Sequence, residues 1–300
     1  MIVAVIVTYE PALAALQKQL DSLVPQVSRV IIVDNGSTTS FPQWLAGLGF
    51  GERLAVFSMQ ENLGIGAAQN IGIEHARSLG ATHVVLFDQD SQPAAGMIDK
   101  LLSAANQLAR SGIRLAAVGP RYKDSEHGEI SGFVRVGWSG FKRVIGTAEQ
   151  PLVEVDFLIA SGVLIPLSAF ESVGLMDGGL FIDHVDTEWC FRARSKGLRL
   201  FGAMDALMIH TLGDQRKKIW FLRWRNVSFH SPFRYYYMFR NSVILQRRVY
   251  MPLRWKIADL MRDFGAFVFF GIFSAQRLVV WRMMLRGISD GLRGVTGKLK

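Results

Sequence analysis

Residues 83–91 read HVVLFDQDS, and the fold prediction starts from this stretch. The apolar, β-branched run from His83 to Phe87 predicts a buried strand, and Asp88 and Asp90 follow it directly. In an extended turn, side chains two residues apart point the same way, so both carboxylates can converge on one hard cation. The alternative interpretation is an ordinary turn that carries two aspartates.

The same pattern of strand and turn recurs on both sides of this stretch. Short apolar runs bounded by Gly, Pro, Asn or Asp predict strands at Val3–Thr8, Arg29–Val33, Leu54–Met59, His83–Phe87 and Leu115–Val118. Helical spacing of apolar residues predicts helices at Pro11–Leu23, Ile65–Leu79 and Gly96–Ser111. This alternation predicts an α/β fold with a doubly wound, mostly parallel sheet, whose ligands lie beyond the carboxyl ends of the strands.

The second half of the chain is less regular. Residues 121–150 predict loop and short antiparallel strands, and Val153–Ile165 returns to an apolar pattern. Further elements are predicted as helices at Ser168–Val173 and Asp186–Lys196 and a strand at Arg199–Ala203. From Arg216 the composition becomes basic and aromatic, so we place a boundary near 214. The predicted domains are 1–214, with halves of about 1–120 and 121–214, and a helical region at 215–300.

Two more polar motifs follow predicted strands. Asp34-Asn35-Gly36-Ser37 follows the second strand, and its alternative interpretation is a simple turn, because Asn-Gly accepts a positive φ. Residues 62–66 (NLGIG) and then Asn70 resemble a glycine-rich dinucleotide loop, although the full glycine spacing is missing. Three polar motifs at three strand ends favour a ligand site more than any one motif does.

The cysteine count, the N-terminal sequence and the charge distribution exclude several classes of protein. The only cysteine, Cys190, excludes an internal disulfide and a cysteine-based metal cluster, and suits a reducing compartment. The chain starts MIVAVIVTYE, which predicts a buried strand and not a signal peptide. The net charge of +9 is concentrated after Arg216, where aromatic residues lie between Arg and Lys. This pattern favours an anionic membrane surface over nucleic acid, for which no binding motif is present; the alternative is a solvated basic face.

Together these motifs resemble glycosyltransferase family 2. The matching stretches are TYE (8–10), DNGS (34–37), ENLGIGAAQN (61–70), FDQDS (87–91), ASG (160–162), LFIDHVDTEWCFR (180–192) and His210. More narrowly, DQDS with FIDHVDTE and RYYYMFRN (234–241) resembles bacterial rhamnosyltransferases. The resemblance implies a GT-A fold and inverting transfer of L-rhamnose from dTDP-L-rhamnose to a lipid-linked surface glycan, such as O-antigen, or to a rhamnolipid acceptor.

The resemblance also implies roles for single residues. Asp90 and His210 would be the main ligands of a divalent metal, Mg²⁺ or Mn²⁺, and Asp88 would contact the metal or the ribose. Asp34 would contact the pyrimidine base, and the family often has Asn where this chain has Glu10. The residues expected at the nucleotide are Thr8, Glu10, Asp34, Asn62, Gly64, Asn70 and Asp88.

Inverting transfer needs a base on the side of the sugar opposite the leaving diphosphate. The family pattern aligns Asp186 with this base, and Asp183 is the second candidate because Val185 stands where a second acid is common. Asp183 could instead cap the helix, and Glu188 could pair with Arg192 four residues on. The residues expected on the acceptor side are Ser161, Gly162, His184 and Glu188.

The C-terminal region carries the membrane prediction. Its most hydrophobic run, Phe264–Phe273, is about half of the roughly twenty apolar residues that a spanning helix needs. We therefore expect an interfacial or re-entrant helix, with a homo-oligomer interface as the alternative, in a peripheral protein on the cytoplasmic face of the bacterial inner membrane. Two other functions remain open: a sugar-nucleotide nucleotidyltransferase, and a non-catalytic, membrane-bound nucleotide-binding module.

Overall fold

The computed structural model describes residues 1–38, 42–124, 130–210, 216–221 and 223–299. Within these ranges, only the backbone is described at residues 42, 43, 46, 124, 210, 216–221 and 223–228. The predicted domain boundary near 214 lies outside the described residues.

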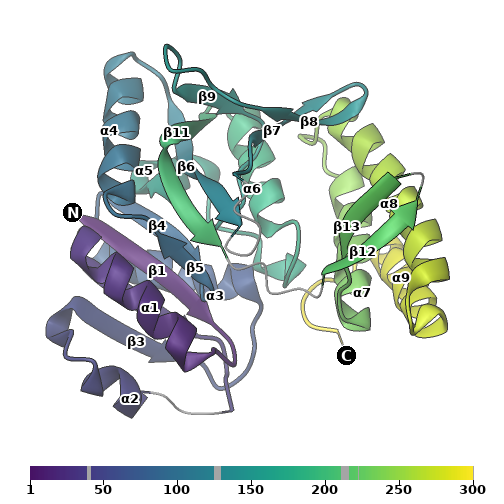
Figure 1. The fold of residues 1–300 in the computed structure, drawn as a ribbon, viewed down its shortest axis with the longest axis horizontal. Coiled ribbons are helices and arrows are strands. Elements are labelled where there is room, and N and C mark those ends of the chain that lie inside the picture. The colour runs from purple at the N-terminus through teal and green to yellow at the C-terminus, as the bar shows by residue number, and fades with distance from the viewer. Residues whose placement is uncertain (39–41, 125–129, 211–215, 222, 300) are drawn as a thin grey trace.

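The first half alternates strands and helices, as predicted (Figure 1). Its elements are β1 (Ile2–Thr8), α1 (Leu13–Leu23), β2 (Arg29–Asp34), α2 (Pro42–Gly47), β3 (Leu54–Ser58), α3 (Ile65–Ser78), β4 (His83–Asp88), β5 (Ser91–Pro93), α4 (Met97–Arg110) and β6 (Leu115–Asp124). All five strands and all three helices predicted for this half are present, within two residues at most ends. The exception is β6, which continues six residues beyond the predicted end at Val118.

The next part is an antiparallel excursion followed by a return to the sheet. Its elements are β7 (Phe133–Gly137), β8 (Gly140–Val144), β9 (Leu152–Val155), β10 (Val163–Pro166), α5 (Leu167–Val173), α6 (Val185–Ser195) and β11 (Arg199–His210). β7 and β8 form the expected antiparallel pair. The predicted last strand ended at Ala203, but β11 runs on to His210 across an irregularity between Ala203 and Leu207.

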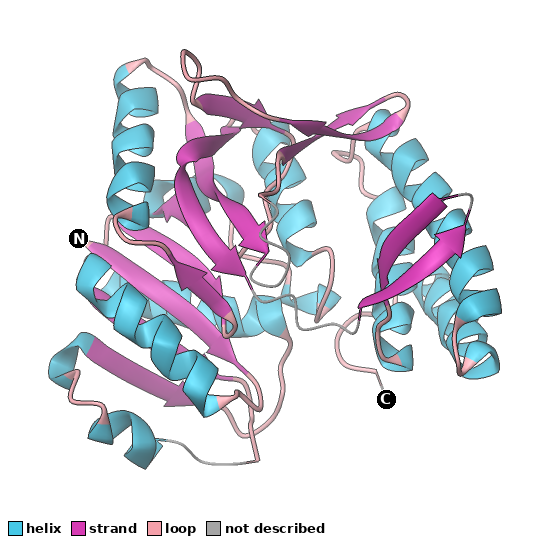
Figure 2. Ribbon diagram, viewed as in Figure 1, coloured by secondary structure: helices cyan, strands magenta, loops and turns pink. Residues whose placement is uncertain are grey.

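One nine-stranded sheet joins these parts, in the order β3-β2-β1-β4-β10-β6-β11-β5 with β9 also on β11. The β3-β2-β1-β4 side is parallel, and β10 enters antiparallel between β4 and β6. Helices cover both faces (Figure 2). Apolar side chains of one core lie beneath α3, α5 and α6, and those of another lie beneath α1 and α4. The mixed sheet is α/β, as predicted, and it brings the carboxyl ends of β1, β2 and β4 to one edge.

The C-terminal region is helical only from Pro232 onward. Residues 216–228 form a two-stranded antiparallel hairpin, β12 (Arg216–Phe221) and β13 (Arg223–Ser228), so the helical prediction for this stretch was wrong. Its aromatic residues, Ile219 and Val227 favour extended backbone. Three helices follow: α7 (Pro232–Gln246), α8 (Leu253–Phe273) and α9 (Arg277–Arg293). They form a layer beside the sheet, and the chain end returns beneath α7 toward the centre of the molecule (Figure 1).

Candidate active site

A cavity of about 730 Å³ lies where the carboxyl ends of β1 and β4 meet the start of α6 and the start of α7. Its size is ordinary for a small-molecule site. Its walls come from strand ends of the first half, from the segment before α6, and from α7. The lining residues are Val7, Thr8, Tyr9, Asn35, Asn62, Gly64, Ile65, Gln69, Asp88, Gln89, Asp90, Ile159, Ala160, Phe181, Ile182, Asp183, His184, Val185, Asp186, Phe233 and Arg234.

The turn after β4 presents Asp88 and Asp90 to this cavity. Its backbone is held from behind, because the Asp88 N–H donates to Ser161 Oγ at 3.1 Å and Gln19 Nε2 donates to the Asp88 carbonyl at 2.7 Å. The intervening Gln89 bonds to both backbone polar groups of Tyr9, at 2.8 and 3.2 Å. The turn that carries the two predicted carboxylates is therefore held against the end of β1.

The predicted metal residues are placed only in part. The His210 side chain lies outside the described residues, but the backbone register of β11 pairs His210 with Ser91, the residue after Asp90. Among the described side chains, no group of three or more His, Cys, Asp or Glu could hold a metal ion. Asp88 and Asp90 nevertheless supply the hard carboxylate oxygens that Mg²⁺ and Mn²⁺ prefer, so this pair fits a divalent cation.

Besides Asp88, three of the residues predicted at the nucleotide line the cavity: Thr8, Asn62 and Gly64. Asp34 does not; it is buried behind Thr8, whose hydroxyl donates to Asp34 Oδ1 at 3.3 Å, and Ser37 Oγ donates to the same oxygen at 2.5 Å.

Two further nucleotide predictions do not reach the cavity. The carboxylate of Glu10 turns away and accepts hydrogen bonds from the N–H and hydroxyl of Thr38, at 2.8 and 2.9 Å. The Asn70 amide forms two 2.9 Å hydrogen bonds with the backbone of Met176. Asn70 therefore supports the segment before α6 in this structure, and its contact with the nucleotide stays a prediction. Gln69 lines the cavity instead. It lies four positions after Ile65, so both residues are on one face of α3.

Both candidate bases line the cavity, but their surroundings differ. Burial raises the pKa of Asp186, and the negative charge of Asp183 raises it further, while the Thr187 N–H donates to Asp186 Oδ1 at 2.7 Å. Asp183 instead pairs with Arg234 at 3.1 Å. The N-cap of α6 is His184, with no side-chain cap bond, so the capping alternative for Asp183 was wrong.

His184 also lines the cavity, with its Nε2 3.3 Å from an Arg262 guanidinium nitrogen. Burial and the Arg262 charge lower the pKa of His184 to about 4. The ring is therefore neutral at physiological pH, and it can exchange hydrogen bonds with a polar ligand without adding charge to the site.

The other acceptor-side predictions fall behind the wall of the cavity. Glu188 is fully buried and pairs with Arg192 at 2.8 Å, so the ion-pair alternative is confirmed and an acceptor contact is not. Ser161 is buried beneath the Asp88 turn. Gly162 has φ +78°, and a Cβ there would lie 2.8 Å from Met208 Sδ, so this position favours glycine. The preceding residues, Ile159 and Ala160, form the wall itself.

The sequence prediction did not place Phe233 and Arg234, which bring α7 to the cavity, at the site. A signal was present for Arg234, because it opens the quoted stretch RYYYMFRN. Tyr122 was also missed. Its hydroxyl donates to the Ser161 carbonyl at 3.2 Å, and burial followed by the charges of Asp186 and Asp88 raises its pKa well above the usual value. Tyr122 is therefore a neutral hydrogen-bond donor close to both Asp186 and Asp88.

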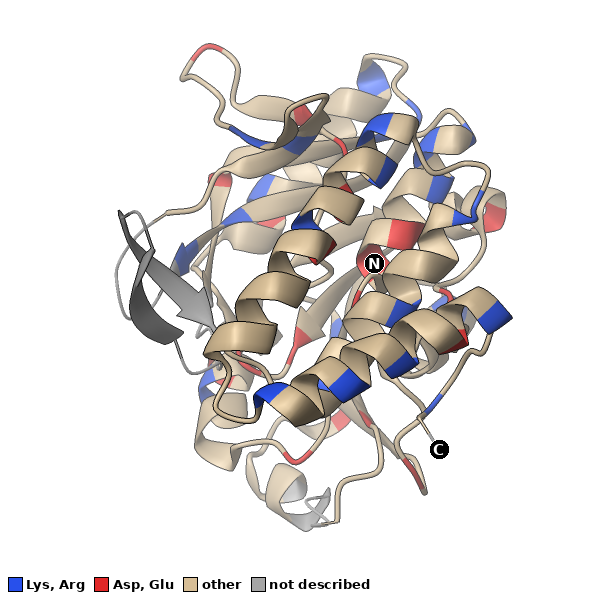
Figure 3. Cartoon of the chain, turned by 90° about the vertical axis from the view of Figure 1, so that its right-hand side faces the viewer, with Lys and Arg blue, Asp and Glu red and all other residues tan. Residues whose placement is uncertain are grey.

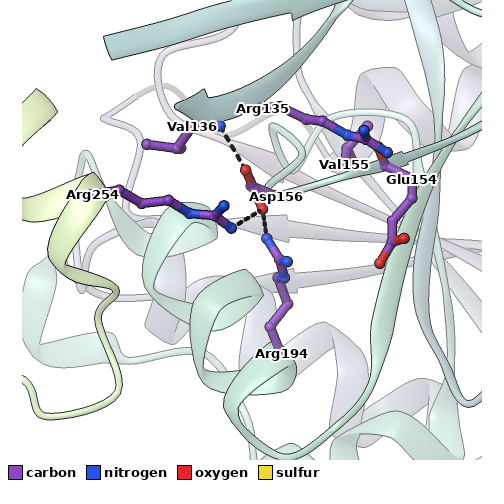
Figure 4. A pocket seen from close by; sticks show the side chains of 7 residues that line it. All are labelled: Arg135, Val136, Glu154, Val155, Asp156, Arg194 and Arg254. Atoms are coloured by element: carbon purple, nitrogen blue, oxygen red, sulfur yellow. Dashed lines mark hydrogen bonds and ion pairs between the residues drawn. The ribbon is translucent and has the colours of Figure 1, made fainter. Parts of the chain in front are cut away.

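A second cavity, of about 240 Å³, lies between β7, β9, α6 and α8 (Figure 4). Asp156 is its centre: it accepts the Val136 N–H at 2.6 Å and pairs with Arg194 and, at 3.2 Å, with Arg254. Since α6 supplies Arg194 and α8 supplies Arg254, these ion pairs join the C-terminal helices to the sheet. This cavity is smaller, and Asp156 within it is paired with two arginines, so the larger cavity is the candidate site.

Comparison with known proteins decides the family. The family model described as glycosyl transferase family 2 matches residues 3–160. The chain is also 32% identical to the dTDP-rhamnosyl transferase RfbF of Shigella flexneri over 297 residues, which are 99% of this chain and 97% of that protein. The chain belongs to glycosyltransferase family 2. It is a glycosyltransferase that uses a sugar nucleotide, and the resemblance to bacterial rhamnosyltransferases is confirmed.

Solved structures of glycosyltransferases share the fold. GalNAc-T7, solved with UDP, GalNAc and Mn²⁺, superposes with a TM-score of 0.64 at 15% identity, over 98% of this chain and 56% of that chain. TarS residues 1–349 of S. aureus superposes with a TM-score of 0.59 at 14% identity, over 97% and 80%. The GT-A prediction is confirmed by these likenesses, which extend through the C-terminal helices of this family 2 enzyme.

Proposed function

We propose that this family 2 enzyme transfers L-rhamnose from dTDP-L-rhamnose with inversion, and that Asp186 is its catalytic base. The donor proposal is supported by the relative that is named a dTDP-rhamnosyl transferase and matches almost the whole chain. The observation that carries the base proposal is geometric. Asp186 and the Asp88–Asp90 pair come from different elements of the chain and line one cavity.

In the proposed reaction, Asp186 accepts the proton of an acceptor hydroxyl. The acceptor oxygen then forms a bond to the anomeric carbon of rhamnose from one side, while the bond to the diphosphate breaks on the other side. The leaving dTDP keeps the electron pair of the broken bond. The raised pKa of Asp186 suits this role, because a more basic carboxylate takes the proton more readily.

A divalent cation is part of this proposal. Asp88, Asp90 and His210 would hold it, supported by the carboxylates at the cavity and by the backbone pairing of His210 with Ser91. When bound, such a cation neutralises the charge that develops on the diphosphate. Among the fold neighbours, GalNAc-T7 was solved with Mn²⁺.

We further propose that the acceptor is a glycolipid or a lipid-linked surface glycan, met at an anionic membrane. Support comes from α8, whose exposed apolar residues recur every three or four positions and so form one stripe along the helix. They are Leu253, Ile257, Leu260, Met261, Phe264, Val268 and Ile272. Phe264 is 72% exposed. A continuous exposed stripe of this kind favours an interaction surface.

The charge beside this stripe favours an anionic partner. α9 adds exposed apolar residues such as Leu278 and Trp281, and its arginines Arg277, Arg282 and Arg286 are exposed as well. Figure 3 shows Lys and Arg positions along the C-terminal helices on this side of the molecule. Such a mixture suits a lipid headgroup surface. Within the described part of the chain, no helix combines the length and apolarity needed to cross a membrane. From the exposed stripe and the arginines of α9, we propose peripheral binding at the cytoplasmic face of the inner membrane.

The proposed function is tested by a donor screen with purified enzyme and a membrane-lipid extract. We expect transfer from dTDP-L-rhamnose at least tenfold faster than from UDP-glucose or UDP-GlcNAc, and loss of transfer with EDTA that Mg²⁺ or Mn²⁺ restores. Equal rates with a UDP-sugar would contradict the donor proposal. Full activity in EDTA would contradict the metal proposal. A nucleotidyltransferase would make sugar nucleotide from sugar phosphate, and a non-catalytic module would release no dTDP.

A further inference from the structure

The segment before Asp186 is conformationally unfavourable. We call residues 178–184 the base loop, because they lead directly into α6 and its Asp186. Three of its non-glycine residues have positive φ: Phe181 at 66°, Asp183 at 61° and His184 at 62°. L-residues rarely adopt this region, and such conformations persist only where the surroundings hold them. The position of Asp186 therefore depends on whatever holds this loop.

One side chain of α7 holds most of the loop. Asn241 is fully buried, and its Nδ2 lies within hydrogen-bond distance of three base-loop carbonyls. It is 2.9 Å from the oxygen of Leu180, 2.7 Å from that of Ile182 and 3.0 Å from that of Asp183. A single amide thus binds the carbonyls that surround the strained residues.

The neighbouring Arg240 fixes the orientation of that amide. Its Nε donates to Asn241 Oδ1 at 3.0 Å, which directs Nδ2 toward the loop. Its Nη2 donates to the Leu180 carbonyl at 2.8 Å, and its Nη1 donates to the Gly297 carbonyl at 2.5 Å. The guanidinium also lies 4.8 Å from the ring centroid of Tyr237. Arg240 is fully buried, and these contacts offset its desolvation.

The opposite side of the base loop rests on the start of α3, which belongs to the side of the cavity predicted to bind the nucleotide. The Ile65 N–H donates to the Phe181 carbonyl at 2.7 Å. Gly64 has φ +88°, and a Cβ there would lie 2.6 Å from the same carbonyl oxygen, so only glycine allows this close approach. The base loop is therefore clamped between α7 and the start of α3. The last residue of the base loop is also bonded to the first turn of α6, because the Glu188 N–H donates to the His184 carbonyl at 2.8 Å.

We propose that Asn241, oriented by Arg240, is a positioning residue that sets the place of Asp186 against the bound donor. This inference rests on the proposed role of Asp186 as the base. Asn241 contacts the loop and not the cavity, so its effect is on the transfer step. A misplacement of about 1 Å can lower a rate by about a hundredfold.

The first test replaces the donor atoms of Asn241 without changing its size. Asn241→Asp keeps an acceptor for Arg240 Nε but loses the N–H groups that bind the three carbonyls. We expect kcat to fall at least tenfold, while the KM for dTDP-L-rhamnose and the Kd for dTDP change less than twofold. A second variant, Asn241→Ala, removes the same hydrogen bonds without adding a buried charge, and we expect the same separation of kcat from KM.

The matched control is the next residue of the same helix. Ser242 is 2% exposed, and its hydroxyl donates to Asp259 Oδ2 on α8 at 2.6 Å, away from the base loop. Ser242→Ala should also lower Tm, because it removes a buried hydrogen bond, yet keep kcat within twofold of the wild type. The proposal is overturned if Ser242→Ala lowers kcat equally, or if both Asn241 variants keep wild-type kcat.

A third variant separates this inference from the function on which it rests. If Asp186→Asn abolishes transfer and the Asn241 variants do not lower kcat, only the positioning role is wrong. If Asp186→Asn transfers at the wild-type rate, the base assignment is wrong and the positioning role is overturned with it.

Discussion

The two walls of the cavity are built in different ways. The nucleotide wall consists of strand ends that share one edge of the sheet, and the register places Thr8 opposite Asp34 and Val7 opposite Asp88. The wall that carries Asp186 is held by a helix far away in the chain, because Asn241 contacts Leu180 across 61 positions. A strand end brings its side chains to the site wherever the sheet forms. A strained loop needs a separate support.

This difference teaches that the C-terminal helices have a direct part in the site. α7 contributes Phe233 and Arg234 to the cavity and binds the loop that leads to the base. The C-terminal helices therefore contribute to the site as well as to the proposed membrane surface. Changes on the nucleotide wall should affect donor and metal, whereas changes on the other wall should affect the transfer step.

The largest effect on the nucleotide wall is expected from Asp90→Ala. It removes a proposed metal ligand, so transfer should fall by about a hundredfold or more, and activity should need a higher Mg²⁺ or Mn²⁺ concentration. The fold should persist, since a turn carboxylate contributes little to the core. Metal titration of the transfer rate and a thermal melt measure both effects. A variant with wild-type metal dependence would show that Asp90 does not bind the cation.

The pH dependence of kcat should report on the wall that carries Asp186. Asp186 acts as a base only when ionised, and burial raises its pKa, so the acid limb of kcat should lie above the ordinary range of an aspartate. Below that pKa the rate should fall about tenfold per pH unit. The measurement is kcat at saturating donor over a pH range from about 4, near the ordinary pKa of an aspartate, to about 8, just above neutral pH. A flat profile through the acid range would exclude an ionising base with a raised pKa.

A smaller effect is expected from Asp183→Asn. The charge of Asp183 contributes to the raised pKa of Asp186, so its removal should move the acid limb of kcat to lower pH. The lost ion pair with Arg234 should lower kcat only several-fold, because exposed and half-buried pairs contribute modestly. If Asp183→Asn instead lost as much activity as Asp186→Asn, the base role would pass to Asp183.

The smallest effect on chemistry is expected at the apolar stripe of α8. Phe264→Ser with Ile272→Ser should reduce sedimentation with anionic vesicles several-fold, while transfer to a water-soluble acceptor analogue stays unchanged. Salt should release the wild-type protein, since screening weakens its contacts with lipid phosphates. Val249, 97% exposed in the connection before α8, provides the control variant Val249→Ser. Equal sedimentation of all three proteins would place the membrane surface elsewhere.

Much of the fold and of the nucleotide wall could be predicted from sequence, because these depend on local patterns. The apolar run before Asp88 predicts both β4 and the turn that follows it. The contacts of single side chains on both walls could not be predicted in the same way. Asn70 has the same chemistry as a nucleotide ligand, but its amide bonds to the backbone of Met176, and only the rotation of α3 decides this. Glu188 lies two residues after Asp186, yet burial and Arg192 remove it from the cavity.

The transfer rate of the Asp186→Asn variant is the most direct test of this account. The substitution keeps the size of the side chain but cannot accept a proton at neutral pH. The raised pKa means that ionisation of Asp186 costs stability, which is lost as pH rises through that pKa. At pH 7 we therefore predict that the variant binds dTDP normally and has a higher Tm than the wild type. Its rate of rhamnose transfer should be lower by about a hundredfold or more. Wild-type transfer by this variant would contradict the account.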